Sequence, residues 1–129
     1  MYIFRTIGDR SGESVTLNNI ASVYDDLGQY SQALDTYNQA LVISRDTLNR
    51  RDEGSIFNNI AYTLLKSEQI MAAEAHFNHA LLALGAIQDD NATDEIQVAL
   101  FQTQVGVYRG LQQALVAQGK KETALEISE

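Results

Sequence analysis

Hydrophobic residues recur every three or four positions along residues 17–41, and Gly28 interrupts the pattern. Such spacing places apolar side chains on one face of an α-helix. The glycine suits a left-handed helix C-cap, because glycine takes positive φ without a Cβ penalty. The stretch therefore predicts two amphipathic helices that fold back on each other. The first apolar face consists of Leu17, Ile20, Ala21, Tyr24 and Leu27, and the second of Tyr30, Ala33, Leu34, Tyr37, Ala40 and Leu41.

A shift of 40 residues aligns the chain with itself. The block NNIA at residues 18–21 recurs at 58–61, and spaced matches extend over the rest of the unit, including Ala33 with Ala73 and Leu41 with Leu81. An internal period of this length indicates a repeat architecture. We therefore predict a first repeat at residues 12–47 and a second at 52–86.

The same alignment makes predictions about the first residues of the chain. Residues 1–7 align with the last part of a second helix, so we expect them to end a preceding repeat whose first helix is missing. Gly8 to Gly12 would then form the turn into the first complete repeat, and Ser14 to Leu27 its first helix. The natural gene product is accordingly expected to be longer.

A third unit, residues 94–129, repeats the pattern with a longer first helix. Gln112 lies 51 residues after Ala61, an excess of 51 minus 40, or 11. Eleven residues are about three helical turns, so the insertion lengthens a helix without rotating its apolar face. We predict one helix over residues 94–118 with a cap signal at Asn91, a break at Gly119, and a last helix over 121–129. The repeated positions of this unit are Tyr108, Leu111, Gln112, Leu115, Gly119 and Ala124.

The spacing L-x2-IA-x2-Y followed by A-x3-Y at residues 17–37 resembles the tetratricopeptide repeat. The resemblance implies an all-α fold, a right-handed α-α superhelix of antiparallel helix pairs, in which residues 1–129 form a single domain. The 40-residue period and the NNIA block resemble the long repeats of kinesin light chains and of large bacterial repeat proteins. Residues 108–129 resemble the segment before the CHAT domain, a caspase-like protease module, in bacterial and especially cyanobacterial proteins. No protease residue of such a domain lies in this chain.

In this family the first helices line a concave groove in which asparagine side chains hold the backbone of an extended peptide. An amide offers both a donor and an acceptor, which suits a peptide main chain of any sequence. The alternative is that these amides cap turns or bond between neighbouring repeats. Arg109, at a position where the first two units carry an asparagine, could bind a carboxylate, and the alternative is that the groove ends there. The positions that the resemblance assigns to the groove are Asn18, Asn19, Ser22, Asp25, Asp26, Asn58, Asn59, Tyr62, Lys66 and Arg109.

Composition narrows the functional classes. The net charge of −8 and the pI near 4.6 repel phosphate backbones and anionic membrane surfaces, so neither nucleic acid nor membrane is expected as a partner. The chain has no cysteine and no apolar run long enough to cross a bilayer, and a cytoplasmic location is the expectation. His76 and His79 lie three residues apart with Glu74 nearby, but two histidines without a cysteine favour a solvated helix face over a metal site. No phosphate loop or catalytic triad order is present, and we expect no cofactor.

Three functions remain open. The first is a non-catalytic scaffold that binds a peptide or a partner domain. The second is an oligomerisation or regulatory segment for a fused C-terminal effector such as the CHAT domain. Truncated end repeats would leave apolar surface open and favour a homodimer. An enzyme in its own right is the third and the least favoured.

Overall fold

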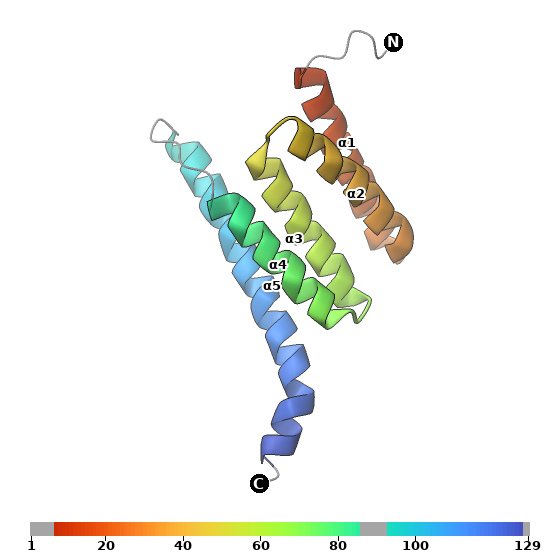
Figure 1. Cartoon of the computed structure of the whole chain (residues 1–129), viewed down its shortest axis with the longest axis vertical. Helices are drawn as coiled ribbons and strands as arrows, with labels where there is room; N and C mark the ends of the chain where they lie inside the picture. The colour runs from red at the N-terminus through yellow and green to blue at the C-terminus, as the bar shows by residue number, and fades with distance from the viewer. Residues whose placement is uncertain (1–6, 86–92, 128–129) are drawn as a thin grey trace.

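The structure, a computed structural model, describes residues 7–85 and 93–127, with side chains described for residues 10–85 and 93–119. These residues form five helices and no strand (Figure 1). The all-α class and the extended first helix of the third unit are therefore confirmed. The helices are α1 (Ile7–Asp26), α2 (Tyr30–Asp46), α3 (Arg50–Lys66), α4 (Ile70–Gly85) and α5 (Asp94–Ile127).

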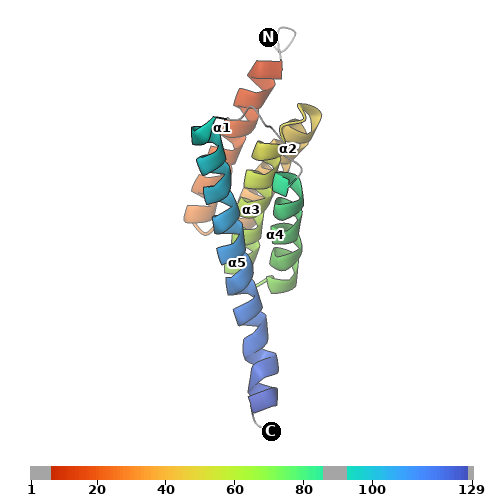
Figure 2. The same ribbon diagram turned by 90° about the vertical axis from the view of Figure 1, so that its left-hand side faces the viewer.

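Successive helices pack as antiparallel neighbours and build a solenoid of helical hairpins (Figures 1 and 2). The closest pairs are α1 with α2 and α3 with α4, and α3 also packs on α2. The fifth helix packs on α4 and α3, as α3 packs on α2 and α1. It thus occupies the place of the first helix of a third unit. Its C-terminal part runs beyond the other helices in both views.

The three short turns share one geometry and lie 20 residues apart. Gly28, Leu48 and Glu68 have φ values of 77°, 55° and 65°. In each turn this residue's N–H bonds to the carbonyl three residues earlier, and the next N–H bonds to the carbonyl five residues earlier. This is the Schellman C-cap, which satisfies two carbonyls at the helix end. A 20-residue helix-plus-turn step produces the 40-residue period of the sequence.

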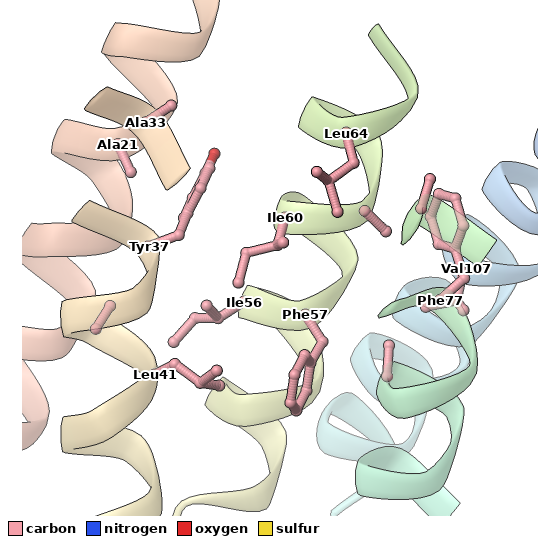
Figure 3. Packing of buried hydrophobic residues seen from close by; sticks show 14 of the residues in the cluster. Ala21, Ala33, Tyr37, Leu41, Ile56, Phe57, Ile60, Leu64, Phe77 and Val107 are labelled. Carbon is pink, nitrogen blue, oxygen red and sulfur yellow. The ribbon is translucent and has the colours of Figure 1, made fainter. Parts of the chain in front are cut away.

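Small residues let the helices approach closely in the core. Ala33 and Ala73, the positions where the sequence predicts close helix contact, are both completely buried. Larger side chains from α2, α3 and α4 fill the space between the hairpins, as Figure 3 shows for Tyr37, Ile56 and Phe77. The fully buried alanines common to the first two units are Ala21, Ala33, Ala40, Ala61, Ala73 and Ala80.

Two predicted interruptions are wrong. Residues 8–12 are helical, because α1 begins at Ile7, and contacts with α2 help to hold this first part of α1. Arg10 forms an ion pair with Asp46 at 3.3 Å, and the buried Ser14 hydroxyl donates to the carbonyl of Ala40 at 3.0 Å. Gly119 does not break α5, because a single glycine costs a helix only about 1 kcal/mol and Gln118 and Lys120 beside it are good helix formers.

The cap of α5 also differs from the sequence prediction. The Thr93 hydroxyl accepts from the Ile96 N–H at 3.2 Å, and its carbonyl accepts from the Gln97 N–H at 3.0 Å. Thr93 is therefore the N-cap. Asn91, Ala86 and residues 1–6 lie outside the described residues.

Candidate partner-binding face

The ten residues assigned to the groove lie on the three first helices, α1, α3 and α5, and one of them, Asp25, is buried. Helix α3 lies between the other two and packs against both. We call this surface the first-helix face. Exposed members are Asn19, Ser22 and Asp26 on α1, Lys66 on α3 and Arg109 on α5, and half-buried members are Asn18, Asn58, Asn59 and Tyr62.

Two of the predicted asparagines bond to each other across the repeats. The Asn59 amide donates to Asn18 Oδ1 at 2.9 Å, which joins α3 to α1. This contact realises the structural alternative that the sequence left open, because both side chains serve neighbouring repeats. Asn19 remains exposed one position away on α1.

A second polar contact lies two helical turns further along α1 and α3. Asp25 is 9% exposed, accepts a hydrogen bond from the Thr63 hydroxyl at 3.0 Å and forms an ion pair with Lys66. Buried carboxylates require partners of this kind, since desolvation penalises the charge. Burial raises the pKa of the nearby Tyr37, and the negative charge of Asp25 raises it further. The ion pair with Asp25 therefore makes Lys66 part of the contact between α1 and α3.

Helix α5 comes very close to α3 at two of its glycines, Gly106 and Gly110. The Tyr62 hydroxyl donates to the carbonyl of Gly106 at 2.6 Å, and burial raises the pKa of that phenol while the charge of Arg109 lowers it. A Cβ on Gly110 would lie 2.3 Å from the Phe77 ring and 2.8 Å from that of Tyr62. Only glycine therefore fits there. The absence of a side chain at Gly110 has a packing reason that the sequence did not suggest.

Asn58 faces the same contact but lacks a partner for one atom. Its Oδ1 is buried with no hydrogen bond among the described residues. Gly106 lies beside it, since a Cβ there would be 3.8 Å from Asn58 Nδ2. Between α1 and α3, Asn18 and Asn59 bond to each other. Between α3 and α5, Asn58 has Gly106 beside it instead of a second asparagine.

Arg109 borders a shallow hollow of about 350 Å³ on α5. Gln112 and Gln113 contribute amides to the hollow, and Val116 and Ala117 contribute apolar surface. A guanidinium is always charged and binds carboxylates through two parallel hydrogen bonds. The hollow therefore combines a carboxylate-binding group with amides that can both donate and accept.

A second hollow, of about 250 Å³, lies between α2, α3 and α4. The Arg45 guanidinium lies 5.3 Å above the Phe57 ring, and His79 meets the same ring edge-on at 5.3 Å. This hollow was not predictable from the sequence, because its residues come from three helices and share no motif. The residues that line it are Arg45, Arg50, Glu53, Phe57, His79, Leu82 and Ala83.

The rings of His76 and His79 both pack against Phe57. His76 Nδ1 lies 2.8 Å from the carbonyl of Ala72, and its ring is tilted against Phe57 at 6.1 Å. In the part of the chain that the structure describes, no three His, Cys, Asp or Glu residues are placed to hold a metal ion. Within the same part, no helix has both the length and the apolarity needed to cross a membrane.

Comparison with known proteins agrees with this architecture. Residues 15–47, which comprise most of α1 and all of α2, match the family model of the tetratricopeptide repeat. The comparisons with curated proteins and with solved structures gave no significant match. The resemblances to kinesin light chains and to CHAT-associated repeats are not addressed by the matched residues and stay predictions. The family match and the all-helical repeat structure together support a tetratricopeptide repeat protein.

Proposed function

We propose that the chain is a non-catalytic interaction module that binds an extended peptide or a partner domain on its first-helix face. Tetratricopeptide repeats are in general protein-interaction modules, and the family match therefore favours this class. The observation that carries the proposal is the hollow on α5, where Arg109 is exposed beside two glutamines. Asn19 is a further exposed polar side chain of the first-helix face, on α1.

The residues divide into two roles within this proposal. Asn18, Asn59 and Tyr62 join neighbouring helices, and Lys66 pairs with Asp25. These residues fix the spacing of the three helices, which a peptide lying across them requires. Asn19, Ser22, Asp26 and Arg109 are the exposed side chains that would contact the partner. Arg109 would bind an acidic side chain or a C-terminal carboxylate.

The test uses the full chain and a random peptide library displayed on phage. Peptides that carry an acidic residue should be enriched, and Arg109→Ala should weaken their binding at least about tenfold, the loss expected for one charged hydrogen-bonded contact. Arg109→Lys should restore binding in part, because it keeps the charge but loses the planar fork. Arg45→Ala, which removes an arginine from α2, is the matched control and should leave binding unchanged.

Circular dichroism spectra should confirm that every variant is folded. The proposal fails if no peptide is enriched. It also fails if the selected peptides bind Arg109→Ala and the parent chain equally well while Arg45→Ala weakens them, because the second hollow would then be the binding site.

A second function, oligomerisation of this chain or regulation of a fused effector such as a CHAT domain, is favoured by the apolar surface at both ends of the solenoid. Helix α1 exposes Ile20, Val23 and Leu27, and α5 exposes a longer series described below. Contiguous exposed apolar surface of this kind marks an interaction site. This proposal includes a CHAT-type effector and a bacterial source, which are supported only by the sequence resemblance. It also includes a cytoplasmic location, which is supported only by the composition.

A further inference from the structure

Helix α5 carries an exposed apolar stripe that none of the described helices covers. The spacing of its members is three, four and three residues from Val98 to Tyr108, and then seven to Leu115, with Gln112 at the intermediate position. Alternating steps of three and four form a seam along a helix suited to packing against a second helix. The apolar members, from 36% to 65% exposed, are Val98, Phe101, Val105, Tyr108 and Leu115.

The stripe lies on the side of α5 away from the solenoid. The side of α5 that packs on α3 and α4 includes the buried Val107, Gly110 and Ala114, and the stripe residues are on the opposite side of the helical wheel. In the second unit the corresponding side of α3 is covered by α4. The backbone of α5 instead continues as helix to Ile127, past the position where the earlier hairpins turn. A helix from elsewhere can therefore reach the stripe.

Charge identifies the kind of partner. Residues 96–118 contain Arg109 as their single charged residue, whereas the chain as a whole has a net charge of −8. A strongly acidic or basic partner would find almost nothing to pair with along this stripe. Two copies of the chain repel each other over most of their surface, but α5 offers them a contact almost free of charge. The stripe therefore fits an uncharged apolar helix face, and α5 itself is such a helix.

We propose that two copies of this chain pair through α5, antiparallel and about a two-fold axis between Val105 and Tyr108. This arrangement places Val105 opposite the partner's Tyr108 and Val98 opposite the partner's Leu115, so apolar residues meet. Gln112 falls opposite Phe101, and Arg109 falls opposite Gln104 rather than the second copy's Arg109. A two-fold contact is closed and self-complementary, so it stops at a dimer.

The pairing gives the oligomerisation function proposed above a surface and a partner, and it rests on that function. The stripe covers 18 residues from Val98 to Leu115, and the 17 steps between them measure about 26 Å of helix at about 1.5 Å per residue. So short a contact is at the small end of specific interfaces, and the dimer should depend on concentration. Asn19 and Asp26 stay available in the dimer, because they lie on α1, which does not contact α5 among the described residues. Arg109 and Gln112 of the α5 hollow lie along the paired helices, so the dimer and a partner at that hollow would compete.

Sedimentation equilibrium on the full chain, over concentrations from about micromolar to millimolar, tests the proposal. The parent chain should show a monomer–dimer equilibrium. Tyr108→Glu should weaken it at least about tenfold, because the substitution buries a charge in an apolar contact. Tyr108 is exposed, so the variant should fold, which circular dichroism will show. Val23→Glu, on the exposed apolar surface of α1, is the matched control and should leave the equilibrium unchanged.

Cysteine pairing tests the direction of the two helices, since the chain has no cysteine of its own. A mixture of the Val105→Cys and Tyr108→Cys variants should give more disulfide-linked dimer on mild oxidation than either variant alone. Equal linkage of the single variants without gain in the mixture would indicate a parallel pair and overturn the two-fold antiparallel arrangement.

Three results of the sedimentation experiment would overturn the proposal in distinguishable ways. A monomer at every concentration would remove both the α5 pairing and the oligomerisation function of the chain by itself. A dimer sensitive to Val23→Glu but not to Tyr108→Glu would keep oligomerisation and move it to α1. A mass that grows beyond the dimer would mean that the α5 stripe packs head to tail on the α1 surface.

Discussion

The second and third units carry the same apolar pattern but differ in what covers it. Phe57, Ala61 and Leu64 of α3 are at most 6% exposed, because α4 packs on them. The matching residues of α5 are uncovered, with Tyr108 60% and Leu115 50% exposed. The comparison shows that helical periodicity predicts which residues share a face. What covers the face depends on the residue at the helix crossing and on the turn that follows.

The crossing residue offers the largest effect. Ala61 is completely buried at the α3 crossing, whereas the matching Gln112 of α5 is exposed. We expect Ala61→Gln to lower the free energy of unfolding by about 2 to 4 kcal/mol, because it overpacks the core and buries an amide without partners. The reciprocal Gln112→Ala should change it by less than about 0.5 kcal/mol, as for most surface positions. Urea denaturation followed by circular dichroism measures both.

Similar losses from the two substitutions would contradict the comparison, because they would mean that Gln112 is buried in solution as Ala61 is. The α5 dimer, if it forms at the concentration used, adds stability to the folded state by mass action. The measurements should therefore be made on the monomer, at a concentration well below the dissociation constant.

The repeat period and the core were predictable from the sequence, and the course of the last helix was not. The 40-residue period arises from equal helices joined by equal turns, so self-alignment detects it. Gly28 predicted the first turn, because glycine favours positive φ. Leu48 and Glu68 adopt a similar positive φ in the next two turns although neither is a glycine. Conversely, Gly119 lies in the register of a turn and is helical. Local chemistry biases a turn, and packing on neighbouring helices decides whether the chain takes it.

The predicted binding residues illustrate a second limit. The sequence shows which polar positions recur on α1 and α3, because the NNIA blocks lie at fixed points of the repeat. It could not separate residues that bond between repeats from residues that are exposed. Asn18 and Asn59 bond across 41 positions of the chain, and Gly110 is required by the ring of Phe77, which comes from another helix. Both depend on how helices are placed in space, which a single sequence does not contain.

The second largest change in stability is expected at Ala73, the small residue at the helix contact of α4. Ala73 is completely buried in α4, and a larger side chain would force the helices of its hairpin apart. We expect Ala73→Leu to lower the free energy of unfolding by about 1 to 3 kcal/mol through overpacking. Ala75→Leu, an exposed position two residues away in the same helix, is the matched control and should be close to neutral. Equal melting temperatures for the two variants would contradict the hairpin register of the second unit.

The smallest effect concerns the two glycines that share the turn register. Gly28 has a φ of 77°, so Gly28→Ala should destabilise the chain by about 1 kcal/mol, the cost of a left-handed alanine. Gly119 lies within α5, so Gly119→Ala should stabilise by about 0.5 to 1 kcal/mol through helix propensity. Thermal unfolding of the monomer measures both changes in stability. A loss for Gly28→Ala together with a gain for Gly119→Ala would show that α5 runs through Gly119 in solution. Destabilisation by both would mean that the chain turns at Gly119 and folds back over Tyr108 and Leu115, closing the third hairpin on itself and removing the surface on which two copies would pair.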